Sequence, residues 1–247
     1  TDRDYTRFLL KRLKADVIFH AAAYKHVPLM EANPIAAIQN NVFGTMHLRE
    51  AAIENGVGRL VLVSTDKAVA PGSVYGASKR LAEEIIRNGD GTTAGMVFRF
   101  GNVLGSRGSI LPLFRRQIEK GGPITITDPA ASRFFMTIPE AVSLVLQAAG
   151  AGQRGQLYVL DMGDPINIKD LAEIGLRPGE KQHETLFDSY EENGGLLSDR
   201  IITVHRPPNA PAAIPSLHGT IDALRPVCFF DQSRPTEYRN RWRLRSV

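Results

Sequence analysis

An acid, a base and a phenol lie within sixteen residues of this chain, between positions 64 and 79. Thr65, Asp66 and Lys67 are consecutive, and Tyr75 and Lys79 follow them. A carboxyl group, an amine and an activated phenol in one site can move protons to and from a substrate. The segment therefore predicts acid–base chemistry, such as removal of the proton of a substrate hydroxyl.

Tyr75 and Lys79 are four residues apart, so on a helix they share one face. A free tyrosine has a pKa of about 10 and is a weak base at neutral pH. An ammonium about 4 Å away stabilises the phenolate by roughly 4 kcal/mol at an effective dielectric of about 20, enough to lower the pKa of the phenol by up to about three. The alternative is a surface tyrosine beside a surface lysine. The position of the pair just after Asp66 and Lys67 favours the catalytic interpretation.

The elements around these residues place them at one end of a strand. Residues 59–63, Arg-Leu-Val-Leu-Val, predict a short buried strand, and residues 75–87 predict a helix with an apolar face. Thr65, Asp66 and Lys67 then follow the carboxyl end of the strand, which is where open α/β sheets bind ligands.

The remaining first half continues this alternation. Residues 16–20 and 96–100 predict strands, and residues 34–54 predict a helix with Asn33 as its cap and Pro34 in its first position. Alternating strands and helices predict an α/β fold with a doubly wound parallel sheet.

The second half predicts smaller elements. These are a helix over 110–120, a strand over 124–127, a helix opened by a Thr137–Glu140 capping box and running through Ala149, and a strand over 157–160. Beyond about residue 190 only an extended, proline-rich segment at 206–215 is predicted. We therefore divide the chain into a catalytic portion (1–108), a substrate-binding portion (109–190) and a C-terminal extension (191–247).

Composition excludes several classes of function. The chain is 43% hydrophobic and 23% charged, as in an ordinary globular protein. Its net charge of +4 is carried by residues 234–247, with five arginines and one glutamate, so no nucleic-acid-binding face is expected. One cysteine, no run of 18 apolar residues and no signal peptide predict a cytoplasmic protein without a membrane span in this chain. No cluster of His, Cys, Asp and Glu has metal-ligand spacing.

At these residues the chain resembles the extended short-chain dehydrogenase/reductase superfamily. Within it, the chain is similar to the polysaccharide-biosynthesis (CapD-like) UDP-N-acetylglucosamine 4,6-dehydratases. Six segments carry the resemblance, in the expected order: His20–Glu31, Asn41–Thr45, Ser64–Ala68, Gly101–Ser109, Arg133–Glu140 and Leu176–Lys181. The resemblance implies a Rossmann-like fold and a lyase that acts on a nucleotide sugar with NADP or NAD for surface polysaccharide synthesis.

The resemblance also implies catalytic roles. Such an enzyme oxidises the sugar at C4, eliminates water across C5–C6 and returns the hydride to C6. Tyr75 would be the base at O4, assisted by Lys79, and Thr65 would hydrogen-bond to O4. Asp66 would be the acid at C6 and Lys67 the base at C5, although these two roles can be exchanged. A strand-end ion pair is the structural alternative for Asp66 and Lys67.

Binding roles follow from the same resemblance. Ala21, Ala22, Lys25, Tyr75 and Lys79 are the expected cofactor-binding residues, and Asn102, Arg133, Arg177 and Glu180 are the expected substrate-binding residues. For Arg133 a structural ion pair is an equal alternative. His20 and Asn41 are expected to be structural, His20 at the strand end and Asn41 on the local backbone. A homo-oligomer is expected.

Two parts of the family pattern have no counterpart. The chain has no glycine-rich pyrophosphate loop after a first strand, and the segment resembling residues 1–14 follows the third strand in the family. A helix end and a strand are also expected between Ile174 and Gly175. Two alternative functions therefore remain: a UDP-hexosamine epimerase on the same scaffold, and a non-catalytic fragment that does not bind cofactor.

Overall fold

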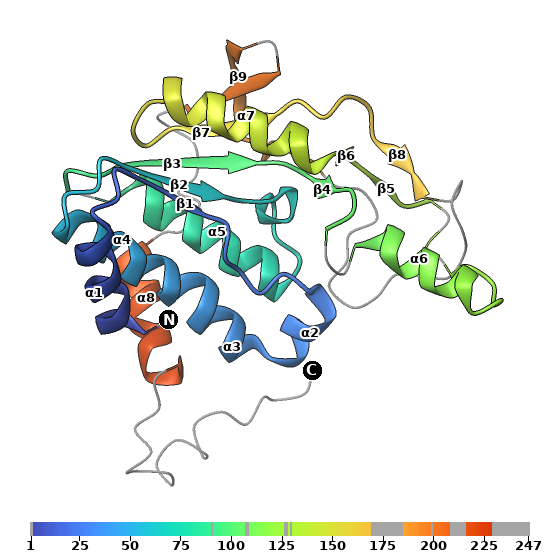
Figure 1. Cartoon of the computed structure of the whole chain (residues 1–247), viewed down its shortest axis with the longest axis horizontal. Coiled ribbons are helices and arrows are strands. Elements are labelled where there is room, and N and C mark those ends of the chain that lie inside the picture. Colours follow the sequence, from blue (N-terminus) through green and yellow to red (C-terminus); the bar gives the residue numbers. More distant parts are fainter. Residues whose placement is uncertain are drawn as a thin grey trace, which may run out of the picture.

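The computed structural model of the chain describes residues 2–89, 91–106, 109–125, 128, 130–168, 185–198, 200–207 and 216–228. Its main sheet has six strands in the order β1-β2-β3-β7-β10-β9 (Figure 1). These are β1 (Val17–His20), β2 (Arg59–Val63), β3 (Ala94–Arg99), β7 (Leu157–Leu160), β10 (Ile201–His205) and β9 (Glu192–Ser198). The first four are parallel, and β10 runs antiparallel to both of its neighbours. The predicted α/β class with a Rossmann-like, mostly parallel sheet is confirmed.

Helices cover both faces of the sheet, and the period of two in each strand explains how. Val61, Met96 and Phe98 pack with α7 (Ile138–Ala151) on one face. Leu60, Leu62 and Val97 alternate with them and pack on the other face. That second face is covered by α1 (Arg3–Leu13), α4 (Gly44–Glu54) and α5 (Val74–Arg87), as Figure 1 shows.

The helix predicted over 34–54 exists but is not regular. It comprises α3 (Pro34–Ile38), a turn of π-helix (Gln39–Phe43) and α4, and a short helix α2 (Val27–Ala32) precedes it. Pro34 occupies the first turn as predicted. Asn33 occupies the N-cap position as predicted, but its side chain makes no cap hydrogen bond; its backbone (φ −135°, ψ 60°) is not extended, and its Nδ2 donates to the carbonyl oxygen of Leu29 at 2.9 Å.

Smaller elements lie beyond the carboxyl ends of the parallel strands. They are η2 (Asp66–Ala68), β4 (Asn102–Val103) paired with β6 (Phe135–Met136), β5 (Ser132–Arg133) paired with β8 (Ile166–Asn167), and α6 (Ile110–Glu119). The capping box of α7 is confirmed: Thr137 and Glu140 bond to each other's backbone N–H. Of the strand predicted over 124–127, Ile124 and Thr125 are not in a strand, and the other two residues lie outside the described ones.

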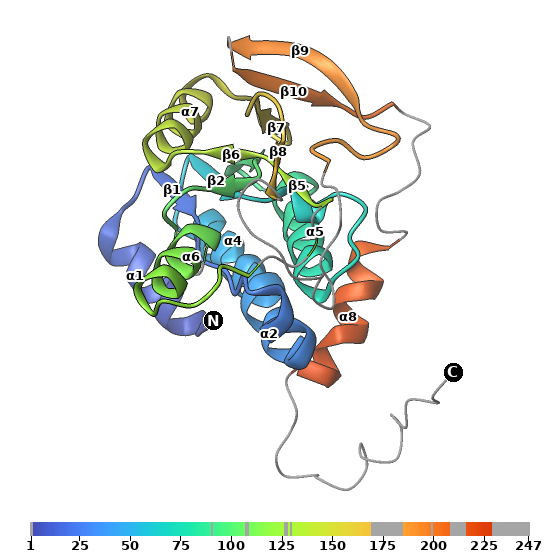
Figure 2. The same cartoon turned by 90° about the vertical axis from the view of Figure 1, so that its right-hand side faces the viewer.

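The sequence predicts no regular element beyond residue 190, yet β9 and β10 complete the main sheet there. Helix α8 (Leu217–Cys228) follows and packs beside α5, with Ile221 buried against Val42, Phe43 and Ile85 (Figure 2). Among the described residues, none of the helices combines the length and the apolar character that a membrane span requires. The division at residues 108 and 190 stays a prediction.

Candidate active site

The residues predicted to be catalytic lie in a tight turn at the carboxyl end of β2. Thr65 precedes η2, and its Oγ1 accepts a hydrogen bond from the backbone N–H of Lys67 at 3.3 Å. The Asp66 Oδ1 accepts hydrogen bonds from Thr65 Oγ1 at 2.7 Å and from Lys67 Nζ at 3.1 Å. The Asp66 side chain is 0% exposed and that of Lys67 is 23% exposed. The turn therefore joins a buried carboxyl group to an ammonium that reaches the surface.

Two further polar side chains, those of Asn102 and Lys25, lie near Lys67. Its Nζ donates to Asn102 Oδ1 at 3.3 Å, which brings the predicted substrate-binding Asn102 to the catalytic turn. The pKa of Lys25 is lowered, first by partial burial and then by the charge of Lys67. Lys25 also lies 3.3 Å from Ser106 Oγ. Ends of three different strands thus contribute polar groups to one place, as the parallel topology predicts.

Tyr75 and Lys79 lie in the first two turns of α5, and both are buried. The Lys79 Nζ donates to the carbonyl oxygen of Val63, the last residue of β2, at 2.7 Å. Burial lowers the pKa of Lys79 to about 8, against the opposing effect of the Glu83 charge. Tyr75 is 7% exposed and packs with Val27, Met30 and Ala37. The strand end and the start of α5 are therefore directly connected through Lys79.

The burial of the Lys79 ammonium predicts that this residue lowers the free energy of unfolding at neutral pH. The unfolded chain keeps a lysine pKa of 10.5, so between about 8 and 10.5 it binds more protons than the folded chain, and stability rises with pH across that range. Lys79→Met should therefore unfold at higher denaturant concentration than the parent at neutral pH, with an advantage that shrinks as the pH approaches 10.5. The catalytic role predicted for Lys79 further requires that this variant be inactive. Denaturant titrations across this pH range check the result, with the exposed Lys11→Met as control, and a less stable variant at neutral pH would contradict it.

Gly76 sets how closely α5 approaches the catalytic turn. A Cβ on Gly76 would lie 2.2 Å from the carbonyl oxygen of Lys67. We expect Gly76→Ala to push the turn away from α5 and to lower the free energy of unfolding by about 1–3 kcal/mol. Gly150→Ala in α7 is the matched control, because its Cβ meets nothing within 4 Å, and alanine should stabilise that helix by about 0.5–1 kcal/mol. Chemical denaturation of both variants makes the comparison, and equal stabilisation by the two changes would refute the steric argument.

The loop after β1 carries the predicted cofactor-binding residues Ala21 and Ala22, both exposed. Asn41 fixes this loop: its Oδ1 accepts from the N–H of Tyr24 at 2.8 Å, and its Nδ2 donates to the carbonyl oxygen of Tyr24 at 2.9 Å. The structural role expected for Asn41 is confirmed. His20 contacts Thr45 Oγ1 at 2.8 Å, and burial followed by the charge of Lys79 lowers its pKa to about 4.

Of the other predicted substrate-binding residues, Arg133 lies beside the site. Arg133 lies in β5, is 7% exposed, and donates to the carbonyl oxygen of Ser132 at 2.8 Å. The carbonyl oxygen of its neighbour Phe134 accepts a hydrogen bond from the backbone N–H of Asn102 at 2.9 Å. Arg133 is therefore one residue from the site. Arg177 and Glu180 lie outside the described residues. Where the structure describes the chain, no three His, Cys, Asp or Glu residues gather as a metal site would require.

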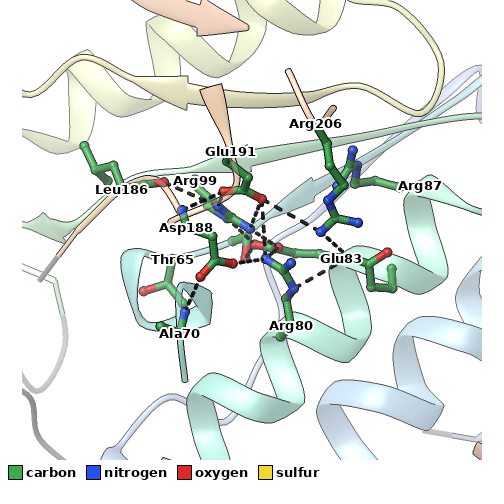
Figure 3. Close-up of polar contacts among 12 residues, drawn as sticks. Thr65, Ala70, Arg80, Glu83, Arg87, Arg99, Leu186, Asp188, Glu191 and Arg206 are labelled. Atoms are coloured by element: carbon green, nitrogen blue, oxygen red, sulfur yellow. Dashed lines mark hydrogen bonds and ion pairs between the residues drawn. The ribbon is translucent and has the colours of Figure 1, made fainter. Parts of the chain in front are cut away.

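Sequence reasoning missed a set of charged residues behind the catalytic turn. Arg99 is the last residue of the apolar strand β3, its side chain is 0% exposed, and it pairs with Glu83 and Glu191 (Figure 3). An arginine within a buried strand needs a buried carboxylate partner. Its presence in the segment Met96–Phe100 was therefore the signal that could have found the cluster.

Comparison with known proteins places the chain in a family. The model of a family described as "Polysaccharide biosynthesis protein" matches residues 1–206. The capsular polysaccharide biosynthesis protein CapD of Staphylococcus aureus is 50% identical over 218 residues, which are 79% of this chain and 36% of CapD. A UDP-glucose 4-epimerase of Rickettsia rickettsii is 41% identical over 192 residues, 70% of this chain and 56% of that protein.

A solved structure agrees with these relatives. Pen from Bacillus thuringiensis has a TM-score of 0.76 and 31% identity, over 90% of this chain and 78% of Pen. The chain thus spans just over a third of CapD and a little over half of the epimerase. The family match, the CapD relative and the Rossmann-like sheet agree: this chain belongs to the polysaccharide biosynthesis protein family of the short-chain dehydrogenase/reductase superfamily.

Proposed function

We propose that the protein is a nicotinamide-dependent nucleotide-sugar 4,6-dehydratase that acts on UDP-N-acetylglucosamine. The observation that carries this proposal is the contact of Asp66 with Lys67 in the turn after β2. Oxidation at C4 alone needs one base, whereas elimination of water needs two further proton-transfer groups, one at C5 and one at the departing C6 hydroxyl. The turn supplies both groups side by side.

Residues after β1 and on α5 would hold the nicotinamide half of a dinucleotide, whereas a glycine-rich loop for its pyrophosphate has no counterpart in this sequence. Ala21 and Ala22 are small and exposed, and Lys79 and Lys25 carry ammonium groups. When bound, the nicotinamide would accept a hydride from the sugar and later return it. Lys79 would also bind the nicotinamide ribose. We propose NADP or NAD as the cofactor.

The chain's own residues divide the proton transfers. Tyr75 takes the proton from O4, with its phenolate stabilised by the Lys79 charge. Asp66 and Lys67 serve C6 and C5, and their contact of 3.1 Å is compatible with either order of these two roles. Thr65 orients Asp66 through its 2.7 Å hydrogen bond, in addition to its proposed contact with O4.

The contact of Asn102 with Lys67 supports a binding site for the nucleotide sugar beside the turn. Asn102 would contact the diphosphate, with Arg133, Arg177 and Glu180 as further binding residues for the UDP group. The product is a UDP-4-keto-6-deoxy-hexosamine for surface polysaccharide. We propose a cytoplasmic location and a homo-oligomer.

A UDP-hexosamine epimerase is the second candidate, and the identity to the rickettsial UDP-glucose 4-epimerase favours it. The deciding experiment incubates the product of the complete gene with UDP-N-acetylglucosamine and either NADP⁺ or NAD⁺, followed by mass spectrometry of the sugar nucleotide. Loss of one water supports the dehydratase. An unchanged mass with a new isomer supports the epimerase. Retention of neither dinucleotide during purification, with no turnover, supports the non-catalytic alternative.

A further inference from the structure

A buried ion cluster lies between α5, β3 and the segment that leads into β9 (Figure 3). Arg99 pairs with Glu83 at 2.7 Å and with Glu191 at 2.5 Å, and all three side chains are 0% exposed. Arg80 pairs with Asp188 at 2.9 Å, and the two side chains are 5% and 7% exposed. Glu84 and Arg206 extend the cluster through a contact at 3.3 Å.

Two carboxylates of this cluster hold the catalytic turn at its two ends. The Ser64 Oγ, directly before Thr65, donates to Glu83 Oε1 at 2.6 Å. The backbone N–H of Ala70, three residues after Lys67, donates to Asp188 Oδ1 at 2.8 Å, and Figure 3 shows this contact. The segment that carries Thr65, Asp66 and Lys67 is thus tied to the cluster on both sides.

The backbone of Ala70 is strained, and its hydrogen bond to Asp188 helps to maintain the strained conformation. Ala70 has a φ of +36°, in the left-handed region that an L side chain disfavours. Such a conformation persists only where surrounding groups enforce it. Asp188 is itself fixed, since its Oδ2 accepts from Tyr190 Oη at 3.0 Å and its N–H donates to Glu191 Oε2 at 2.9 Å.

We propose that Asp188 is a positioning residue for the catalytic turn, acting through the Ala70 N–H and supported from the other end by Glu83. This inference rests on the proposed dehydratase activity. Asp188 holds Asp66 and Lys67 where water elimination needs them. Tyr75 and Lys79 lie on α5, and Thr65 follows Ser64, which Glu83 rather than Asp188 holds, so the first step at C4 depends less on Asp188.

The expected effect is therefore step-specific. In Asp188→Ala we expect the rate of water loss to fall by roughly 10- to 100-fold with KM unchanged, because a misplacement of about 1 Å can cost that much. Reduction of the nicotinamide, followed by its absorbance in a single turnover, should change by no more than about threefold, since the C4 base is in place. Asp188→Asn keeps an oxygen for the Ala70 N–H and should recover most of the rate.

Glu84→Gln is the matched control, because Glu84 is a buried carboxylate of the same cluster whose contacts are with Arg80, Arg206 and Asn88. It should lower the free energy of unfolding, but it should not slow water loss more than it slows nicotinamide reduction. Ala70→Gly adds a second test: glycine adopts the positive φ without strain, so Asp188→Ala should cost less in that background.

Hydrogen exchange of the Ala70 amide gives a readout that does not depend on the reaction. Exchange should be faster in Asp188→Ala than in the parent and in Glu84→Gln. If the parent protein releases no water, the proposed function fails, and the exchange result alone decides whether Asp188 fixes the turn. An unchanged exchange rate at Ala70, or an equal loss of both steps in an active enzyme, would overturn the inference.

Discussion

Asp66→Asn is expected to abolish water loss while C4 oxidation continues. Asparagine keeps the shape of the side chain and can still accept from Thr65, but it cannot donate or accept a proton in catalysis. Proton transfer by a positioned group contributes about 10²–10⁴-fold, so water loss should fall by that factor. The oxidised sugar and the reduced nicotinamide should then accumulate on the enzyme, which absorbance and mass spectrometry of the bound sugar nucleotide would detect.

Asp161→Asn provides the control for this change. Asp161 follows β7 as Asp66 follows β2, but it is exposed, and its Oδ1 accepts the N–H of Gly163 at 3.0 Å. Its replacement should leave turnover unchanged. If Asp66→Asn retained nearly full activity and the product had the mass of the substrate, the enzyme would be an epimerase, because exchange of configuration at C4 needs no acid at C6.

Arg99→Met is expected to have the largest effect on stability. It leaves Glu83 and Glu191, both 0% exposed, with one fewer buried cation between them. Removal of one partner from a buried ion pair typically costs about 3–5 kcal/mol, and we expect a loss of this size in the free energy of unfolding. Chemical denaturation measures it. Arg115→Met, in an exposed pair with Glu119, should cost about 0–1 kcal/mol.

The same variant should respond to pH in a defined direction. Burial raises the pKa of Glu83, but the charge and hydrogen bonds of Arg99, together with Arg80 and Ser64, outweigh it, so the folded pKa is below the usual 4.5. The stability that this carboxylate contributes is present above about 4.5 and is lost as the pH falls through the folded pKa. Without Arg99, the effect of burial dominates, and the folded pKa of Glu83 should lie above its unfolded value. The stability difference between parent and variant should therefore narrow in acid.

A compensated variant separates the charge effect from packing. Arg99→Met combined with Glu83→Gln and Glu191→Gln removes the unpaired charges and should recover much of the lost stability, as neutral replacements of buried ion groups often do. If the combined variant were as unstable as Arg99→Met alone, packing around the Arg99 side chain rather than charge would be the cause.

Local sequence patterns were sufficient for the elements that carry the site. Apolar runs at 59–63 and 157–160 correspond to β2 and β7, and the capping box at Thr137 opens α7. They failed where local signals are ambiguous. Asn33 has the side chain of a cap, yet it makes no cap hydrogen bond, because it also ends α2 and its backbone (φ −135°, ψ 60°) is not in the extended conformation that a cap adopts. Strand β9, with Gly194 and Gly195, lacks an apolar period and gave no strand signal.

The sequence by itself determined the α/β class, the family and the candidate residues of the turn after β2, because these depend on short-range periodicity and on consecutive motifs. Only the tertiary structure decided how that turn is held. The Arg99–Glu191 contact joins residues 92 positions apart, and the Ala70–Asp188 contact joins residues 118 positions apart. No local pattern encodes such a pairing, because burial and electrostatic complementarity arise only when β3, α5 and the segment before β9 pack together.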